Sequence, residues 1–409
     1  MTPAERRASG SLATVFAARM LGLFLVLPVF ALEAARYPGG GDPALVGLAM
    51  GIYGLTQGLL QIPFGMASDR FGRKRVIVLG LVIFAAGSFI AAAAPSLGWL
   101  VAGRALQGAG AVSAAVTALL ADQTRDVVRT KAMALVGASI GLMFALSLVV
   151  APLLAAAIGL AGLFTVTGLL ALGCIAVVLW WTPPAPAHKA DAGSGSGAAV
   201  PRGRLAEVLS HPGLLRLDIG VFVLHAVQLA MWVALPAMLV EAGLAQDRHW
   251  KVYLPAVLAS FVVMGAVFPL ERRGYLRAVF LGAVALLALV QLGLLGASYQ
   301  PGLPLLAVLL FLFFCAFNVL EATQPSLASR IAPPRSRGAA LGVYNTLQSL
   351  GFFAGGAVGG WMAKNVGGAG LFGVSAALML VWLVVAWPMR APRARQSAEE
   401  VLADEAQAT

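Results

Sequence analysis

The fold of this chain is decided by one stretch, Gly65-Met66-Ala67-Ser68-Asp69-Arg70-Phe71-Gly72-Arg73-Lys74-Arg75. It lies between two apolar runs, at roughly 44–68 and 76–94, and it is too short to form a domain. It therefore predicts a tight turn between two membrane-spanning helices. Four of its last six residues are cationic, and short cytoplasmic loops collect Lys and Arg, so we expect this turn on the cytoplasmic side.

The composition of the whole chain predicts a helical membrane protein. Of its 409 residues, 60% are hydrophobic and 11% are charged, whereas about a quarter of the residues of a soluble domain are charged. The alternating segments of about ten residues that form a membrane β-barrel do not run through the sequence. The two cysteines, Cys174 and Cys315, lie inside apolar runs and show neither a disulfide framework nor a zinc spacing.

Twelve runs are apolar and long enough to cross a bilayer as helices, because a crossing takes about 20 residues. They lie at approximately 12–33, 44–68, 76–94, 99–121, 131–157, 161–181, 214–240, 251–270, 276–297, 303–329, 338–362 and 367–388. The first run follows Arg6 and Arg7 and has no clear small-residue cleavage site, so we expect a retained span and not a signal peptide.

The Lys and Arg residues favour one orientation of these spans. With the N-terminus inside, 22 of the 28 fall in cytoplasmic loops and ends, 4 fall on the opposite side, and Arg19 and Arg104 fall inside spans. This bias predicts that both termini are cytoplasmic. It also accounts for the net charge of +11 without a nucleic-acid partner.

The two halves of the sequence predict two six-helix lobes. The segment between them is rich in Pro, Gly and Ser, a composition that stays flexible and solvated. A weaker copy of the opening stretch, Glu271-Arg272-Arg273-Gly274, follows the eighth run. Repeated halves of this kind place a transport site at their interface, near the middle of the bilayer. We expect an N-terminal lobe, a flexible cytoplasmic linker, a C-terminal lobe and a polar cytoplasmic tail, at 1–182, 183–213, 214–390 and 391–409.

Three motifs resemble those of the major facilitator superfamily. Residues 65–74 match its motif G-x-x-x-D-R-x-G-R-K/R, and residues 104–111, Arg-Ala-Leu-Gln-Gly-Ala-Gly-Ala, match its motif R-x-x-Q-G-x-G-A. Residues 22–29 are similar to the first-span motif of the drug/proton antiporter branch, whereas the compact fifth-span motif of that branch is not kept. Together these regions resemble a YajR-type subgroup of bacterial drug-efflux-like carriers. Some members carry a further cytoplasmic domain after the last span, which we do not expect here.

Asp69 needs a partner, because it ends a helix, where the macrodipole disfavours a carboxylate. We expect it to cluster with Arg73 and with Asp122, which ends the fourth run. The resemblance implies that this cluster docks on the other lobe when the cytoplasmic side is closed. Its expected partner is the positive N-terminus of the eleventh run. The predicted latch comprises Gly65, Asp69, Arg70, Gly72, Arg73, Asp122 and Gly338.

Ionisable side chains inside a membrane are costly, so each is a functional candidate. Glu321, in the tenth run, lies about 12 Å from the cytoplasmic end and is a candidate for proton coupling or substrate contact. His225, in the seventh run, lies at a similar depth; its ordinary pKa suits a proton switch, and packing is the alternative role. For Arg104 the resemblance implies a role in proton coupling, and a structural hydrogen-bond anchor is the alternative.

Polar and aromatic side chains at helical spacing could line a substrate cavity or join neighbouring helices. The candidates are Gln57, Gln61, Asn318, Asn345, Gln348, Tyr53 and Trp232.

These observations predict a proton-coupled secondary transporter that works by alternating access and exports amphipathic drug-like compounds or metabolites. Its expected partners are a small-molecule substrate, protons and the lipid bilayer, and a monomer is expected. A carrier of the same fold for a sugar or organic acid, acting as an importer, is the first alternative. A membrane-embedded enzyme and a receptor without transport are the others. We expect no catalytic residue, cofactor or metal, because the chain has no nucleotide-binding loop, metal spacing or paired nucleophile and base.

Overall fold

A computed structural model of the chain describes residues 1–184, 202–333 and 336–389, and within these ranges it contains helices and no strand. The elements of the first half are α1 (Pro3–Phe24), α2 (Phe30–Ala34), α3 (Pro43–Phe71), α4 (Arg73–Ala92), α5 (Leu97–Ala109), α6 (Ser113–Asp122), α7 (Asp126–Ala176) and η1 (Val177–Trp181). Those of the second half are α8 (Arg202–Ser210), α9 (Pro212–Glu241), η2 (Gln246–Arg248), α10 (Trp250–Leu270), η3 (Glu271–Tyr275), α11 (Leu276–Ala297), α12 (Leu303–Ile331), α13 (Arg337–Asn365) and α14 (Gly367–Ala386).

Nine helical stretches among the described residues are long and apolar enough to cross a membrane. One of them, Lys131–Trp181, covers two of the predicted spans. It bends at Gly159, whose φ of 64° and ψ of −175° lie outside the helical region. The predicted runs 12–33 and 338–362 are not among the nine. It therefore remains a prediction that the chain crosses the membrane twelve times and that both termini are cytoplasmic.

At one end of the bundle, polar contacts link the turns and helix ends of the first half of the chain. Arg125, after α6, pairs with Glu5 at the start of α1 over 2.8 Å, from Nε to Oε1. Arg73, at the start of α4, reaches Asp122 at the end of α6, and Lys74 donates to the carbonyl of Thr182 over 2.5 Å. We call this end the N-terminal face.

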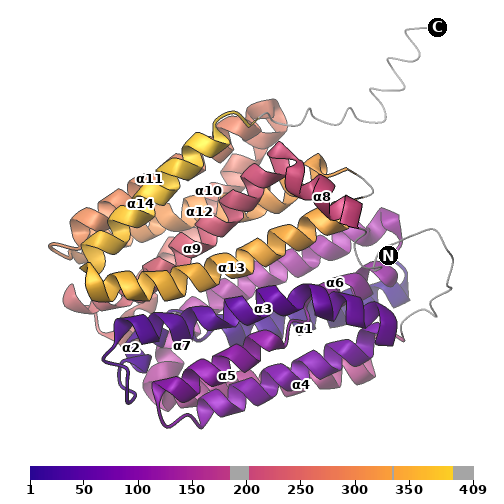
Figure 1. Cartoon of the computed structure of the whole chain (residues 1–409), viewed down its shortest axis with the longest axis horizontal. Helices are drawn as coiled ribbons and strands as arrows, with labels where there is room; N and C mark the ends of the chain where they lie inside the picture. Colours follow the sequence, from indigo (N-terminus) through magenta and orange to yellow (C-terminus); the bar gives the residue numbers. More distant parts are fainter. Residues whose placement is uncertain (185–201, 334–335, 390–409) are drawn as a thin grey trace, which may run out of the picture.

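The other end of the first half is the opposite face. There, the Leu97 N–H donates to the Pro38 carbonyl over 3.0 Å. A cavity of ≈ 410 Å³ lies between the loops of this end; its lining includes Glu33, Tyr37, Pro95 and Gly159. The long helices thus run between two faces, as the common direction of the ribbons in Figure 1 also shows.

The chain forms two helical bundles that meet along α3 and α13. Figure 1 shows α1 and α3–α7 in one half of the molecule and α9–α14 in the other, with α3 and α13 side by side at the boundary. Within the predicted linker 183–213, residues 202–210 form α8, and 185–201 lie outside the described residues. The predicted tail 391–409 also lies outside them. The lobe boundaries remain predictions.

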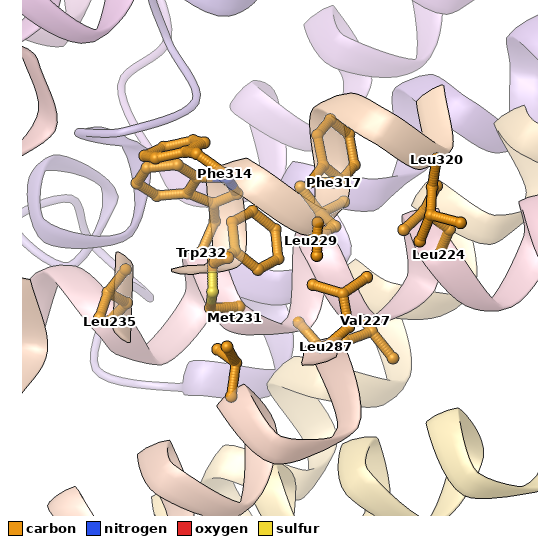
Figure 2. Packing of buried hydrophobic residues seen from close by; sticks show 14 of the residues in the cluster. Leu224, Val227, Leu229, Met231, Trp232, Leu235, Leu287, Phe314, Phe317 and Leu320 are labelled. Carbon is orange, nitrogen blue, oxygen red and sulfur yellow. The ribbon is translucent and has the colours of Figure 1, made fainter. Parts of the chain in front are cut away.

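Aromatic and branched side chains fill the second bundle. Figure 2 shows Trp232 of α9 beside Phe314 of α12, with Leu287 of α11 close to Val227. All four side chains are at most 2% exposed. This packing holds α9 and α12 at fixed positions, and both carry polar side chains of the candidate site.

The contact between α3 and α13 is tight over only part of its length. A Cβ on Gly356 would lie 2.6 Å from the Gly47 carbonyl oxygen and from the Gly51 nitrogen, so these helices touch backbone to backbone toward the opposite face. Toward the N-terminal face, a Cβ on Gly342 or Gly338 would meet no atom within 4 Å. The two bundles are therefore closed together at the opposite face, and their central pair of helices separates toward the N-terminal face.

Candidate functional site

Three helices of the second bundle bring His225, Glu321 and Gln348 together. The His225 Nε2 lies 3.3 Å from Glu321 Oε2 and 2.8 Å from the amide nitrogen of Gln348. The same amide donates to Glu321 Oε1 over 3.2 Å. His225 is 1% exposed, whereas 41% of the Glu321 side chain is exposed. We call these three residues the proton site, after the role that the sequence predicts for His225 and Glu321.

The hydrogen bonds of His225 fix a hydrogen on one ring nitrogen and leave the protonation of the other open. Its Nδ1 lies 2.8 Å from the Val221 carbonyl oxygen, which can only accept, so Nδ1 carries a hydrogen. A neutral Nε2 accepts from the Gln348 amide; a protonated Nε2 donates to the Glu321 carboxylate. Phe352 and Phe317 flank the ring, with centroids at 4.8 and 6.0 Å, and shield it from water. The site can therefore hold or release one proton at a defined atom.

A second acidic residue of this bundle, Asp218 in α9, was not predicted from the sequence. Asp218 is 3% exposed, and within the described part of the chain no hydrogen bond or ion pair reaches its carboxyl group. The hydroxyl of Tyr344 on α13 is also buried and without a hydrogen-bond partner among those residues. The available signal was an aspartate six residues into the helix Pro212–Glu241, which is 30 residues long and mostly apolar.

Arg104 is held by neutral acceptors in the first bundle. It is 4% exposed, donates to Gln107 Oε1 over 2.9 Å and to the Met50 carbonyl over 3.4 Å, and lies over the ring of Tyr53. The Tyr53 hydroxyl in turn accepts from Arg19 over 2.8 Å. Tyr53 thus contacts two buried guanidinium groups and is itself 5% exposed. Its predicted place in a substrate cavity remains a prediction.

The opening stretch forms an ion-pair cluster. Arg73 is 5% exposed; its Nε lies 3.0 Å from Asp122 Oδ2, its Nη1 donates to the Ser68 hydroxyl over 2.8 Å, and it pairs with Asp69. Gly72 has a φ of 97°, the positive value that favours glycine. The structure therefore brings together Asp69, Arg73 and Asp122 at a turn of the expected kind.

Other members of the predicted latch contribute less. Arg70 is exposed and lies 5.4 Å from the ring of Phe71. A Cβ on Gly65 would lie an ordinary 3.7 Å from Ala114 in its own bundle, so this glycine is not required for a close contact here. Gly338 has open space around it, so it makes no tight helix contact. Docking of the cluster on the start of α13 remains a prediction.

The remaining candidates for the substrate cavity differ in burial and in their partners. Trp232 is fully buried in the core, against the Tyr253 ring at 5.5 Å, because α9 turns that face into its own bundle. Its predicted contact with a substrate remains a prediction. Asn318 donates to the Ser260 hydroxyl over 2.9 Å and so ties α12 to α10. Gln61 is 5% exposed, and Gln57 and Asn345 are half-buried. No cluster of side chains suited to a metal ion occurs in the described ranges.

Comparisons with known proteins agree with this architecture. The sequence profile described as Major Facilitator Superfamily matches residues 12–356 and 253–407. The chain is 44% identical to the inner membrane transport protein YajR of Escherichia coli (strain K12), over 96% of this chain and 85% of that protein. It is 26% identical to the multidrug resistance protein MdtH of Aeromonas salmonicida (strain A449), over 89% of this chain and 87% of that protein.

A solved structure gives the same fold. The crystal structure of a D-xylose-proton symporter is similar with a TM-score of 0.74 at 14% identity, over 94% of this chain and 98% of that one. At that identity the likeness shows the fold alone. With several apolar helices and the relation to YajR, the protein is a multi-pass inner-membrane protein. The predicted family is confirmed, and it is a family of transporters and not of enzymes: the chain belongs to the major facilitator superfamily.

Proposed function

We propose that the chain is a proton-coupled secondary transporter that exports amphipathic compounds in exchange for protons by alternating access. The observation that carries this proposal is the proton site, where His225, Glu321 and Gln348 meet inside the second bundle. A relative named as a multidrug resistance protein supports the substrate class.

The proton enters the mechanism at His225 Nε2. When it arrives, the imidazolium donates to Glu321, and the Gln348 amide loses its acceptor on the ring and keeps only its bond to Glu321. Because Gln348 lies on α13, the helix that packs on α3, the protonation state acts on the contact between the two bundles. Protonation thereby biases which face is open.

Polar contacts between the two bundles also hold the opposite face closed. Lys364 of α13 donates to Asp42, which precedes α3, over 2.8 Å. Gln246 of the second bundle donates to Glu33 of the first over 3.0 Å. With the N-terminal face in the cytoplasm, this arrangement is the inward-facing half of the cycle.

The test is transport into proteoliposomes under an imposed pH gradient, with ethidium, tetracycline and D-xylose as probes. An antiporter accumulates its substrate when the lumen is acidic, and a symporter does so when the lumen is alkaline. We expect accumulation of ethidium or tetracycline with an acidic lumen. Accumulation of D-xylose with an alkaline lumen identifies an importer of sugars instead, and no response to either gradient overturns proton coupling.

Glu321→Gln removes the charge with the smallest change of shape. We expect the variant to lose about 100-fold or more of gradient-driven transport while exchange of probe across equal pH continues, because only the proton step is removed. Glu241→Gln, at the exposed end of α9, is the matched control and should transport normally. Gradient-driven transport by Glu321→Gln at the wild-type rate would remove this carboxylate from the mechanism.

A further inference from the structure

We infer that Asp218 and Tyr344 form a proton relay between the proton site and the N-terminal face, and that Asp218 holds a proton in this conformation. This inference rests on the proposed function and adds a second protonatable residue to it.

The first observation is the surroundings of Asp218. A charged carboxylate that is 3% exposed and meets no hydrogen bond or cation in the described residues is very costly in a membrane-spanning helix. The neutral, protonated carboxyl is far less costly. At 3% exposure the carboxyl is more open to a proton than to an organic cation, so a proton is the ligand we infer.

The second observation is the position of Tyr344. Gly351 lies against Phe222 and Gly355 against Ala226, so α9 and α13 run parallel and in step. Tyr344 is therefore on the same level of the bundle as the first turns of α9, next to Asp218. Its hydroxyl is buried without a partner in the described chain and lies within electrostatic reach of both the Asp218 and the Glu321 carboxyl groups.

The order of the groups along the helices gives the direction of the relay. Asp218 precedes His225 by two turns, about 10 Å nearer the N-terminal face, and Tyr344 precedes Gln348 by one turn. A tyrosine hydroxyl both donates and accepts, so it can pass a proton from Glu321 to the Asp218 carboxylate without becoming charged for long. Asp218 then gives the proton to water at that face, toward which α3 and α13 are already separated.

The ionisable groups near Asp218 in the described structure are compatible with a protonated carboxyl. Tyr344 on α13 lies within electrostatic reach of Asp218, and Glu321 on α12 lies within electrostatic reach of the same hydroxyl. On its own helix Arg216 is half-buried and His225 lies on the far side of the relay. None of these is a cation paired with Asp218 in the described structure, so the proton is what neutralises it.

The test uses infrared spectroscopy of the full-length protein in detergent, recorded as difference spectra during a pH titration. A protonated carboxyl has a carbonyl-stretch band separate from that of a carboxylate. We expect wild type to show such a band at acidic pH and to lose it as the pH is raised, Asp218→Asn to lack it, and Asp218→Glu to keep it at a shifted position. Asp247→Asn, on an exposed residue of η2, is the control and should keep it. Retention of the full band in Asp218→Asn overturns the inference.

Transport assays separate this inference from the proposed function. In the proteoliposome assay, Asp218→Asn should reduce gradient-driven uptake about tenfold or more and leave exchange at equal pH intact, with Tyr344→Phe affected in the same sense. If Glu321→Gln is uncoupled but Asp218→Asn and Tyr344→Phe transport as wild type, the relay is wrong and the proposed function stands. If replacing sodium by choline abolishes transport in wild type, Asp218 serves a metal cation and the relay is also wrong.

Discussion

At the scale of single residues, Arg73 is the side chain that joins the turn after α3 to the end of α6. It is 5% exposed and serves Asp122, Asp69 and the Ser68 hydroxyl at once. Its two carboxylate partners are 17% and 22% exposed, so water compensates them only in part when the guanidinium is removed. The stability of this cluster therefore depends on one arginine.

Arg73→Ala should lower the free energy of unfolding by about 2–3 kcal/mol, below the range for a fully buried pair because both acids keep some contact with water. Arg70→Ala is the matched control: Arg70 is exposed and lies only over the Phe71 ring, so its loss should change stability by less than about 0.5 kcal/mol. Thermal unfolding in detergent measures both. Equal effects of the two substitutions would contradict the role of Arg73 as the centre of the cluster.

The residue scale also shows what a sequence can and cannot predict. His225, Glu321 and Gln348 each stand out as polar side chains in apolar runs, but their meeting depends on how α9, α12 and α13 pack, which no local pattern encodes. Asp218 was not predicted because it lies near the start of its run, where a carboxylate is expected to be solvated; the packing of neighbouring helices buries it. Trp232 illustrates the same limit, since helical spacing does not reveal whether a face meets a cavity or a core, and in this conformation its ring packs on Tyr253.

At the scale of elements, the contact of α3 with α13 explains why a helix of low apolarity can lie in the membrane. α13 is rich in glycine and amides because it packs on α3 and α9 more than on lipid, and for the same reason it falls short of the apolarity expected of a span. The glycines on this contact fall into two groups, tight toward the opposite face and open toward the N-terminal face.

Because the glycines fall into these two groups, replacing a glycine by alanine should have different outcomes at the two ends of the contact. Gly356→Ala places a Cβ 2.6 Å from backbone atoms of α3, a clash that costs about 1–3 kcal/mol in the closed arrangement and should shift the population toward an open opposite face. Gly342→Ala meets nothing within 4 Å and should leave the population unchanged.

Spin labels at Gly41→Cys and Tyr299→Cys, one on each bundle at the opposite face, report the distance between them. Both native cysteines are buried and can be replaced by serine beforehand. A longer distance in Gly356→Ala than in Gly342→Ala is the expected result. Identical distance distributions would mean that α3 and α13 are not the hinge contact.

Element boundaries were predictable where a glycine or proline interrupts an apolar run. The division of α7 at Gly159 falls between the predicted runs 131–157 and 161–181. The interruptions after α1 and after α5 were not predicted, because runs 12–33 and 99–121 read as continuous; the structure leaves residues 110–112 non-helical. Arg19 contacts this break through the Ser113 hydroxyl over 2.9 Å, so a partner from another helix stabilises what local sequence does not encode.

At the scale of the whole molecule, two kinds of contact hold the opposite face closed, the glycine packing of α3 on α13 and the polar pairs Lys364 with Asp42 and Gln246 with Glu33. The proton site lies apart from both, in the interior of the second bundle. For the proposed proton coupling, the question is which of these regions responds to pH in the physiological range.

The pair of Asp42 and Lys364 does not respond in that range. The bond from Lys364, together with the Ala44 N–H, lowers the pKa of Asp42 below its ordinary value of 3.8 in the closed arrangement. A carboxylate whose pKa is lowered favours the closed arrangement fully above its ordinary pKa, and this contribution is lost only as the pH falls through the lowered value. Between about pH 5 and 8 the pair is therefore constant, and its effect is modest because both side chains are partly exposed.

The same spin-label pair tests this conclusion. In wild type the distance across the opposite face should be insensitive to Asp42 between about pH 8 and 5 and should lengthen only below about pH 4. Asp42→Asn should lengthen it slightly at every pH and abolish that acid transition. Any change that wild type does show between about pH 8 and 5 must come from another group, and it should disappear in Glu321→Gln and persist in Asp42→Asn. The reverse pattern would move the pH response from the interior of the second bundle to the surface of the closed face.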